Sequence, residues 1–467
     1  MTTARSGTDH SDAFVFFGAT GDLAFKQIFP ALARLIGDEG WDLPIIGVAR
    51  HGDVAMLKAR AEQSISAQGP VDTPVLKRLQ AALRFVKGSD DDPATFAALR
   101  TELSTAKHPL HYLAIPPALF GTAVKLLGSS GCALGARVIV EKPFGTNRAD
   151  AQRLNATLHT VFKEDAIFRI DHYLGKEPVQ NLQYFRFANR FLEPIWNSDH
   201  VASVQLTMAE AFDVADRGAF YDHEGAIRDV VQNHILQVIS ILAMEPPSGY
   251  GVEALRNAKF KVLDSIKPLR PDAVVRGQYD GYRDVTGVAP DSKVETYVAF
   301  RLDVQTWRWG GVPFYVRTGK CLPVTATEVL VNLKRPPQDM FHEPEDADSN
   351  YLRFRLTPDM SISLVARAKK AGEQMVGEPV ELSAMHQDGS ERPPYERLIG
   401  DAASGDQLLF AREDMVEAAW RIVDPILDAN EPPIPYNRGT WGPAAAEAII
   451  GGDEHWRAPT AGPAAPA

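Results

Sequence analysis

The stretch "AFVFFGATGDL", residues 13–23, joins five apolar residues to a turn that holds two glycines, and a helical pattern follows. An apolar run without alternation is typical of a strand buried on both faces of a parallel sheet. Glycines at a strand-to-helix turn let the backbone approach a pyrophosphate, and the free amides of the helix N-terminus then face its charge. The spacing of Gly18 and Gly21 departs from the full G-x-G-x-x-G pattern, so a plain glycine turn remains the alternative interpretation.

The alternation of strand and helix continues to about residue 173. Helix-like segments such as residues 150–162 separate further apolar runs. These runs are "LPIIGVAR", "LRFVKG", "LHYLAIPP", "ARVIVEKPFG" and "IFRIDHY". Apolar strands joined by helices predict a doubly wound α/β domain, whose parallel sheet is covered by helices on both faces.

Beyond residue 200 the runs become longer, and polar residues alternate with apolar ones. Examples are "VASVQLTMAE", "KVETYVAFRLDV", "TEVLVNLKR", "YLRFRLTP" and "MSISLVARAKK". Strands clustered in this way, with helices kept apart from them, predict an α+β domain with a mainly antiparallel sheet. We therefore expect a dinucleotide-binding domain over 1–175, a substrate-binding and dimerisation domain over 176–450, and a flexible tail over 451–467.

The composition limits the classes of partner and compartment. Lys and Arg number 49 against 60 Asp and Glu, a net charge of −11, which argues against nucleic acid and anionic membranes as partners. Cys132 and Cys321 are the only cysteines, so neither a disulfide framework nor a cysteine metal site is expected. Residues 1–12 lack the apolar segment of a secretory signal, and no later run has the length of a membrane span. We expect a cytoplasmic protein that needs no metal.

The second predicted strand, "IIGVAR", ends in Arg50. Domains that bind NAD commonly carry an acid at this point, because a carboxylate accepts hydrogen bonds from the ribose hydroxyls. A guanidinium instead pairs with the 2′-phosphate of NADP. The pattern therefore favours NADP, and an ordinary surface arginine that closes a strand is the alternative.

The stretch "RIDHYLGKE", residues 169–177, follows the last predicted strand of the first domain. Open α/β sheets bind their ligands at the carboxyl ends of the strands. If a helix begins there, His172 and Lys176 are four residues apart and share a face, which suits an anionic phosphate. Asp171 would then point elsewhere. A solvated charged loop is the alternative interpretation.

The stretch "GAIRDVVQNHILQVISILAM", residues 225–244, predicts a helix with His234 among the apolar residues of one stripe. A histidine in such a stripe, taken alone, is more often a structural core residue. A buried imidazole beside a carboxylate, however, has the near-neutral pKa and the fixed tautomer that a general base needs. Asp171 is the candidate carboxylate.

Several long motifs occur in one order along the chain. They are "GATGDLAFKQIFPAL", "EKPFG", "RIDHYLGKE", "YFRFANRFLEPIWN", "DRGAFYD", "IRDVVQNHILQ" and "WRWGGVPFYVRTGK". This set and its order resemble the glucose-6-phosphate dehydrogenase family, and the resemblance runs from about Phe14 to the end of the second domain. It implies a Rossmann-like first domain and a larger second domain with a mainly antiparallel sheet.

The resemblance implies a role for each residue that matches a family motif. The coenzyme-binding set is Gly18, Thr20, Gly21, Leu23, Arg50, Lys142 and Pro143. The substrate-binding set is Lys142, the phosphate-binding trio His172, Tyr173 and Lys176, and the sugar-binding residues Glu210, Asp229 and Lys320. Asp171 and His234 match the catalytic dyad. Taken singly, Lys142, Glu210, Asp229 and Lys320 each have an ordinary structural interpretation, and the order of the motifs favours the functional one.

The chain departs from the family pattern at three places. Phe25 stands where relatives usually begin a basic run, so one contact of that run is missing. His51 follows Arg50 where strongly NADP-selective relatives often carry Ser or Thr, which leaves use of NAD open. Thr325 stands where relatives tend to have Lys or Arg, so one basic contact near the substrate is absent.

The implied activity is oxidation of glucose 6-phosphate at C1 with hydride transfer to NADP, the first step of the oxidative pentose phosphate pathway. The resemblance also implies a homodimer, or a dimer of dimers, formed through the large antiparallel sheet. Two alternatives stay open. One is a catalytically silent NADPH-sensing or scaffold protein of the same fold, and the other is a dehydrogenase for another aldose phosphate or for free hexose.

Overall fold

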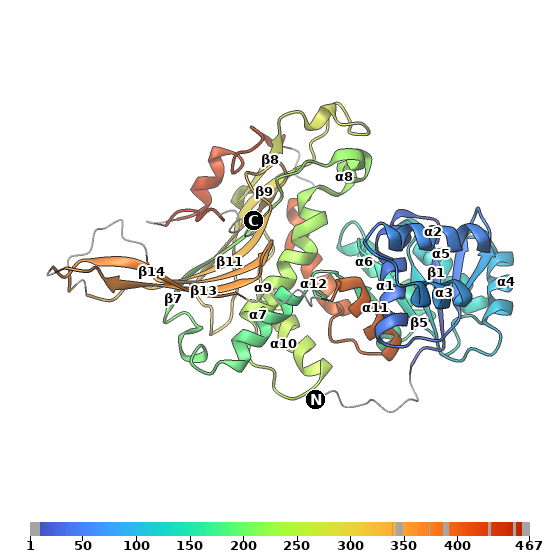
Figure 1. Ribbon diagram of the computed structural model, residues 1–467. Helices are drawn as coiled ribbons and strands as arrows, with labels where there is room; N and C mark the ends of the chain where they lie inside the picture. Colours follow the sequence, from blue (N-terminus) through green and yellow to red (C-terminus); the bar gives the residue numbers. More distant parts are fainter. Residues whose placement is uncertain are drawn as a thin grey trace. The chain divides into compact units, whose positions relative to one another are not determined.

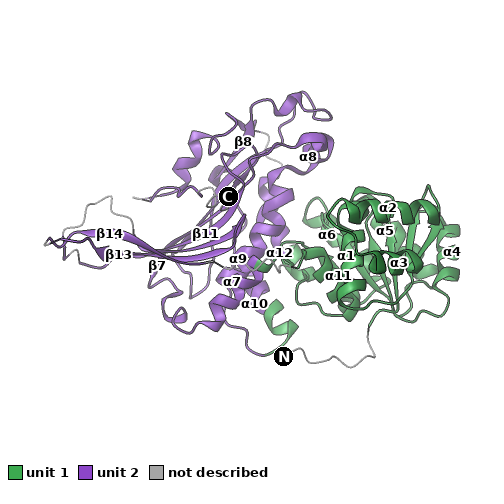
Figure 2. Cartoon of the chain, viewed as in Figure 1, with its two compact units in different colours: residues 1–177, 250–256, 391–417 green, residues 178–249, 257–390, 418–467 purple. Residues whose placement is uncertain are grey.

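The computed structural model describes residues 10–338, 340–341, 349–372, 374–385, 392–427, 431–451 and 454–459. The chain forms two compact units, coloured green and purple in Figure 2. Unit 1 consists of residues 1–177, 250–256 and 391–417, and unit 2 of residues 178–249, 257–390 and 418–467. The domain boundaries expected from the sequence stay a prediction, because these units are defined by compactness. None of the helices in the described ranges combines the length and the apolar character needed to cross a bilayer.

Unit 1 is built on a sheet of six parallel strands in the order β3-β2-β1-β4-β5-β6. The strands are β1 (Ala13–Phe17), β2 (Ile45–Ala49), β3 (Leu83–Lys87), β4 (Pro109–Leu113), β5 (Arg137–Glu141) and β6 (Ile167–Ile170). This confirms the predicted doubly wound, Rossmann-like fold. Because β1 has β2 on one side and β4 on the other, the strand order reverses at β1, where open α/β sheets form a ligand crevice.

Helices cover both faces of this sheet (Figure 1). The helical elements of unit 1 include η1 (Ala24–Ile28), α1 (Phe29–Asp38), α2 (Val54–Ser66), α3 (Thr73–Ala82), α4 (Pro93–Leu103), η2 (Pro117–Leu119), α5 (Phe120–Ser129), α6 (Arg148–His159), η3 (Glu164–Ala166) and α11 (Pro394–Ser404). On the other side of β1 from α1, Phe17 stacks on Phe96 of α4, with ring centroids 5.6 Å apart. Every side chain of β1 is therefore buried, which explains its unbroken apolar sequence.

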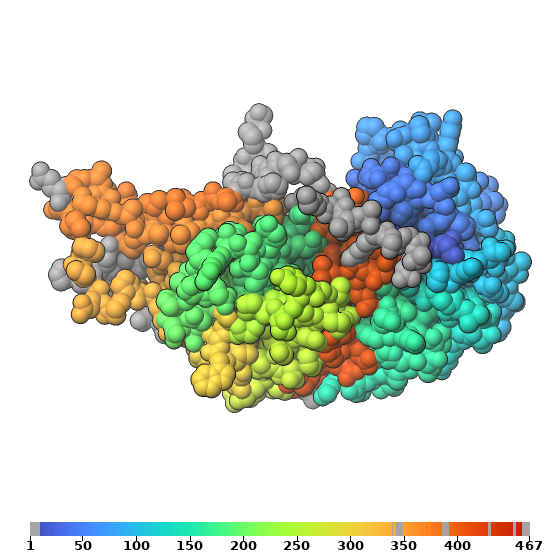
Figure 3. Space-filling model, turned by 90° about the horizontal axis from the view of Figure 1, so that it is seen from below, coloured from blue at the N-terminus to red at the C-terminus, as the bar shows by residue number. Residues whose placement is uncertain are grey.

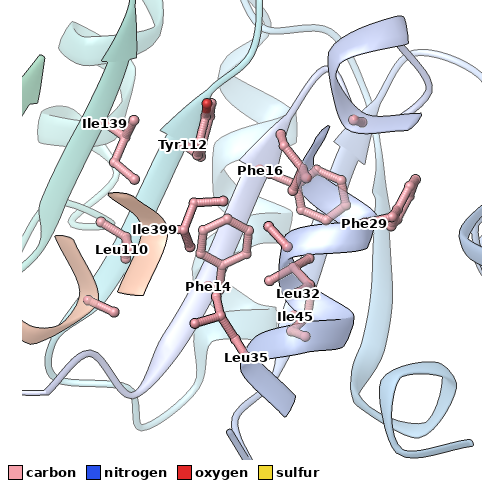
Figure 4. Packing of buried hydrophobic residues seen from close by; sticks show 14 of the residues in the cluster. Phe14, Phe16, Phe29, Leu32, Leu35, Ile45, Leu110, Tyr112, Ile139 and Ile399 are labelled. Atoms are coloured by element: carbon pink, nitrogen blue, oxygen red, sulfur yellow. The ribbon is translucent and has the colours of Figure 1, made fainter. Parts of the chain in front are cut away.

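The core between β1 and α1 is shown in Figure 4. The ring of Phe16 meets that of Phe29 edge to face, with centroids 5.6 Å apart and an interplanar angle of 88°. Phe14 meets Tyr112 of β4 in the same way at 6.3 Å. Ile399 of α11 belongs to this cluster, so α11 contributes to the core of unit 1 although it lies far along the chain. Full burial of each such side chain is worth about 1.5–3 kcal/mol.

Unit 2 holds a nine-stranded sheet in the order β14-β13-β12-β11-β7-β10-β9-β8-β15. Its strands are β7 (Val201–Ala209), β8 (Val274–Tyr279), β9 (Tyr297–Asp303), β10 (Pro313–Gly319), β11 (Ala326–Leu333), β12 (Tyr351–Thr357), β13 (Ser361–Lys369), β14 (Gly377–Met385) and β15 (Ile434–Tyr436). Neighbours are antiparallel except for β10 beside β7 and β15 beside β8. The predicted mainly antiparallel sheet is confirmed.

The helix predicted over residues 225–244 is present from Ala226 to Ala243, and a break at Gly225 separates it from the helical residues before it. The helical elements around it are α7 (Glu177–Ala188), η4 (Glu193–Ile195), α8 (Gly218–Ala226), η6 (Ile227–Ile235), α9 (Leu236–Ala243), α10 (Val252–Ser265) and α12 (Glu413–Val423). Gly225 has φ 64° and ψ 177°, which breaks the helix, and a Cβ there would meet Oε1 of Glu295 at 2.5 Å. That Oε1 accepts a hydrogen bond from the Ile227 amide at 3.0 Å, so a carboxylate anchors the start of η6.

Part of the segment expected to be a tail packs against the sheet of unit 2. Trp456 is buried, meets Tyr315 of β10 with ring centroids 6.3 Å apart, and donates its indole N–H to the Ala446 carbonyl at 2.9 Å. The Arg457 amide donates to Oε1 of Gln205 at 3.0 Å. Residues 452–453 and 460–467 of the expected tail lie outside the described residues.

Candidate functional site

The predicted coenzyme turn lies between the carboxyl end of β1 and the start of η1. Gly18 has φ 72°, and a Cβ at this position would lie 2.1 Å from the carbonyl oxygen of Ala114, which follows β4. Only glycine fits there, because both the conformation and the close approach exclude a side chain. The Gly21 amide donates to the Gly18 carbonyl at 2.9 Å, and helical structure begins at the next residue. Thr20 and Leu23 belong to the same segment, so this turn presents a helix N-terminus at the crevice.

Arg60 of α2 contacts this turn, although it is not among the site residues predicted from the sequence. Its Nη2 donates to the Gly21 carbonyl at 3.1 Å, and its guanidinium carbon lies 5.0 Å from the centroid of the Phe25 ring. A cation over an aromatic face is stabilising. The aromatic residue at position 25, a departure from the family pattern, therefore packs against an arginine. Arg60 is 39 residues from Gly21, and no local pattern in the sequence connects the two.

Arg50 follows β2, and its side chain is exposed. Asp90, which follows the neighbouring strand β3, is buried, and this burial raises the pKa of its carboxyl while the charge of Arg50 acts to lower it. Arg50 thus lies at the carboxyl edge of the sheet, on the β2 side of the coenzyme turn.

Lys142 and Pro143 directly follow β5 and are joined by a cis peptide bond. The preceding residue, Glu141, is held by two phenols. Tyr112 of β4 donates its hydroxyl to Oε1 of Glu141, and Tyr395 of α11 forms a second hydrogen bond with the same carboxyl. Burial raises the pKa of Glu141 to about 7, against the lowering effects of the Tyr112 hydrogen bond and the Lys142 charge. Lys142 therefore follows a strand end that is fixed by the two hydrogen bonds of Glu141.

Asp171 stands at the end of β6 and is 1% exposed, and its Oδ1 accepts a hydrogen bond from the Tyr173 amide at 3.0 Å. The helix that would place His172 and Lys176 on one face does not begin here, which corrects the expectation. Residues 171–176 instead form tight turns with i to i+3 hydrogen bonds, and α7 starts at Glu177. Three-residue spacing brings Lys176 over Tyr173, with Nζ 3.8 Å from the ring centroid.

His172 completes this cluster from its other side. Its ring stacks on that of Tyr395 at an interplanar angle of 13°, with centroids 6.4 Å apart, and lies 5.4 Å from the Tyr173 ring centroid. Within unit 1 the structure thus brings together the predicted phosphate-binding trio and adds Tyr395 to it. A histidine and a lysine on aromatic faces are suited to an anionic group.

Glu210 and Lys320 meet within unit 2. They follow the neighbouring parallel strands β7 and β10, whose last residues Ala209 and Gly319 are paired. Nζ of Lys320 lies 2.5 Å from Oε2 of Glu210, and Lys320 is only 7% exposed. A charged donor and a charged acceptor placed side by side can bind vicinal sugar hydroxyls.

Tyr221 of α8 lies beside these sugar-binding candidates and was not predicted from the sequence. Nζ of Lys320 is 5.0 Å from the centroid of its ring. Burial raises the pKa of the Tyr221 hydroxyl, and the charges of Asp229 and Glu210 raise it further. The ring therefore stays neutral among charged groups. Its only sequence signal is its place in the motif "DRGAFYD".

His234 is part of η6 and is 4% exposed, and its backbone amide donates to Oδ1 of Asn233 at 2.7 Å. It belongs to unit 2, whereas Asp171 belongs to unit 1. The pairing of these two residues remains a prediction.

One group of potential metal ligands lies in unit 1, formed by His159, Glu164 and Glu413. Nη1 of Arg169 donates to both carboxylate oxygens of Glu164 at 2.8 and 3.0 Å, and Nε2 of His159 lies 2.6 Å from Oε2 of Glu413. These bonds already engage the oxygens that a cation would need. The group is better described as an ion-paired contact that ties the start of α12 to β6.

Comparison with known proteins matches both halves of the chain to one family. Residues 15–181 match the family model for the glucose-6-phosphate dehydrogenase NAD binding domain, and residues 183–457 match that for the C-terminal domain. Glucose-6-phosphate 1-dehydrogenase 1 from Mycobacterium tuberculosis is 42% identical over 466 residues, covering 97% of either chain. The enzyme from Bacillus subtilis is 36% identical, covering 95% of this chain and 97% of its own length.

Solved structures agree. Glucose-6-phosphate 1-dehydrogenase from Mycobacterium avium superposes with a TM-score of 0.91 at 42% identity, covering 98% of this chain and 100% of its own. A glucose-6-phosphate dehydrogenase in complex with glucose 6-phosphate superposes with a TM-score of 0.87 at 33% identity, covering 95% and 98%. The chain therefore belongs to the glucose-6-phosphate dehydrogenase family.

Proposed function

We propose that this chain oxidises the β-anomer of glucose 6-phosphate at C1 and passes the hydride to a nicotinamide coenzyme, releasing a 6-phospho-lactone. The observation that carries this proposal is family membership across both domains. A 33% identical relative is described in complex with glucose 6-phosphate as its substrate. Nothing in the described ranges favours a catalytically silent protein or another sugar substrate, so neither alternative is proposed.

We assign the coenzyme to the turn that follows β1, and we propose NADP as the preferred form. The close approach at Gly18 and the helix N-terminus at Gly21 fit a pyrophosphate. Arg50, which is exposed at the end of β2, supports NADP, because a guanidinium attracts a 2′-phosphate that an acid at that point would repel. When bound, the coenzyme supplies the hydride acceptor. Lys142 and Pro143, at the end of β5, complete the proposed set.

The phosphate of the sugar is assigned to His172, Tyr173 and Lys176. The cation of Lys176 lies over the Tyr173 ring, beside His172 in the same turn, and a lysine ammonium is a donor suited to an anionic phosphate. The sugar hydroxyls are assigned to Glu210, Asp229, Lys320 and Lys142. The Glu210–Lys320 pair at 2.5 Å supports this, because it sets a charged acceptor beside a charged donor.

His234 is the proposed general base, and Asp171 its partner. The imidazole takes the proton of the C1 hydroxyl as the hydrogen on C1 leaves with its electron pair, and the C1 carbonyl forms. Asp171 orients the ring and stabilises it once it is protonated. Both groups are almost fully buried, with 1% of Asp171 and 4% of His234 exposed, and burial strengthens interactions between charges.

The test is a spectrophotometric assay with glucose 6-phosphate and either NADP or NAD. We expect near-ultraviolet absorbance from reduced nicotinamide with the parent protein. His234→Asn should lower kcat about 100- to 10,000-fold, the range for a general base, with glucose 6-phosphate binding retained in calorimetry. His200→Asn, which changes an exposed histidine of unit 2, is the matched control and should keep the parent rate. No turnover by the parent protein with either coenzyme would refute the activity.

We also propose that the protein is a cytoplasmic homodimer, or a dimer of dimers, joined through β13 and β14. These strands project past the helices of unit 2 (Figure 3), and β14 forms the edge of the sheet. One face of the pair is apolar, because Ile362, Leu364 and Ala366 lie opposite Ala384, Leu382 and Val380. Leu382 is 63% exposed, and Leu364 and Val380 are each 37% exposed. A contiguous exposed apolar patch is typical of an interface.

A further inference from the structure

Lys320 stands in a turn where the regular hydrogen bonding of the sheet stops. The next residue, Cys321, has φ 54°, a left-handed conformation that ends β10. Backbone groups in this turn must therefore find partners outside the strand ladder. The Lys320 amide donates to the Thr296 carbonyl at 2.9 Å, and the Cys321 amide to the Phe212 carbonyl at 3.1 Å.

Glu210 is tied to the same turn from the other side. Its amide donates to the Gly319 carbonyl at 3.0 Å, and its carbonyl accepts from the Leu322 amide at 3.0 Å. The backbones on either side of the Glu210–Lys320 ion pair are thus linked, so a shift of the Lys320 backbone changes the geometry of the pair.

The Lys320 carbonyl is held by a residue that lies far away in the sequence. Tyr436, the last residue of the short strand β15, donates its hydroxyl to this oxygen at 2.7 Å. The Gly439 amide donates to the adjacent Cys321 carbonyl at 2.7 Å. Residues 436–439 therefore form a strap across the turn that carries Lys320.

The phenol of Tyr436 is fixed in place. Its residue is 4% exposed, and its ring meets that of Tyr297 with centroids 5.6 Å apart. Its hydroxyl also lies 3.2 Å from Oγ1 of Thr296. Burial raises its pKa, so the hydroxyl keeps its proton and acts as a donor throughout the working pH range.

We propose that Tyr436 is a positioning residue for sugar binding, which holds the Lys320 backbone so that the Lys320 ammonium and the Glu210 carboxylate meet the substrate in one fixed geometry. This inference rests on the proposed sugar-binding role of Lys320 and goes beyond it. Preorganised groups bind more tightly because less motion has to be lost on binding. Loss of the hydroxyl leaves the ring and its packing in place, and it removes the hydrogen bond to the Lys320 carbonyl together with the longer contacts to Thr296.

The first experiment is Tyr436→Phe. We expect the KM for glucose 6-phosphate to rise about three- to tenfold, as for the loss of one neutral hydrogen bond, with kcat within about twofold of the parent. The KM for the coenzyme should not change, because the proposed coenzyme site belongs to unit 1. The inhibition constant of inorganic phosphate should also stay constant, because the proposed phosphate trio belongs to unit 1. A general loss of folding would worsen all of these constants together and would overturn the inference.

Tyr297→Phe is the matched control. Tyr297 is equally buried and belongs to the same aromatic cluster, and among the described residues its hydroxyl has no hydrogen-bond partner. Removing that hydroxyl should leave the KM for glucose 6-phosphate within about twofold of the parent. An equal rise in KM in both variants would show that Tyr436 acts only through core packing.

A double-mutant cycle with Lys320→Met separates this inference from the function on which it rests. If Tyr436 acts through Lys320, adding Tyr436→Phe to Lys320→Met produces no further rise in KM. If the two effects multiply, Tyr436 does not act through the lysine, and the inference fails while the role of Lys320 stands. If Lys320→Met alone leaves KM unchanged, the sugar-binding role of Lys320 is wrong and the inference falls with it.

Discussion

Glu141→Gln should remove a pH dependence of stability that the burial of this carboxyl creates. The folded protein raises the pKa of Glu141 from 4.5 to about 7, mainly by burial. The neutral acid is therefore favoured by folding, and this advantage is complete below pH 4.5. It is lost progressively as pH rises from 4.5 to 7, because over this range the unfolded chain has released a proton that the folded state retains, and above 7 both states are ionised and the loss levels off. The wild-type protein should thus lose stability over this window, and a variant with a neutral amide should not.

The size of the effect follows from the two pKa values. Between pH 5 and pH 8 the free energy of unfolding of the parent should fall by about 2–3 kcal/mol relative to the variant. For a cooperative unit of about 200 residues, that corresponds to about 5 °C in Tm. The glutamine can keep both hydrogen bonds, because its amide oxygen accepts from Tyr112 and its amide N–H can donate to the Tyr395 oxygen.

The assay is a set of paired thermal melts of parent and variant in the same buffers at half-unit steps of pH. Titrations elsewhere in the chain cancel in the difference between the two Tm values. Tyr112→Phe supplies a second check, because its hydrogen bond lowers the pKa of Glu141, and its loss should move the window to higher pH. A difference between parent and Glu141→Gln that stays constant from pH 5 to pH 8 would refute the reasoning.

Three further changes test other parts of the proposal. Thr325→Val removes the hydroxyl that accepts a hydrogen bond from the Ala211 amide at 2.9 Å. Steady-state kinetics should show the KM for glucose 6-phosphate raised about two- to fivefold and the KM for the coenzyme unchanged. An equal rise in both KM values would contradict a local role for Thr325. Arg50→Ala should lower kcat/KM for NADP about 10- to 100-fold and leave that for NAD within about twofold, and parallel losses would argue against a 2′-phosphate contact. Leu382→Lys places a charge on the apolar face of β14, so light scattering should show a smaller assembly than for the parent, whereas an unchanged mass would exclude that face as the interface.

The fold could be predicted where burial left a clear pattern in the sequence. Strands β1, β2, β4 and β6 are buried along their whole length, so their apolar runs were recognisable one by one and in order. Strand β15 has only three residues and includes Pro435, so it carries no usable pattern. The break at Gly225 lies against the Glu295 carboxylate, 70 residues away along the chain, and helical periodicity contains no trace of that contact.

Only those residues of the candidate site that belong to contiguous sequence motifs could be predicted. Residues in contiguous motifs, such as Lys142 and Lys320, were assigned from the sequence, and the structure places them at the ends of strands. Arg60, Tyr221 and Tyr395 were missed, because their importance comes from what they contact. The turn at His172 was also misjudged, since the spacing of His172 and Lys176 allows an α-helix and the chain instead forms successive tight turns.

In each unit, a buried tyrosine from the last third of the chain forms a hydrogen bond at or next to a proposed site residue. Tyr395 bonds to Glu141, next to Lys142 in unit 1, and Tyr436 bonds to the Lys320 carbonyl in unit 2. Burial raises the pKa of both phenols, so each remains a neutral donor when the charged groups around it titrate. A lysine or arginine in either place would add a positive charge, which would compete with the proposed site residues for the anionic substrate. A buried tyrosine holds the backbone or the carboxyl without altering the net charge of the site, which is why these two positions call for a phenol rather than a stronger, ionic contact.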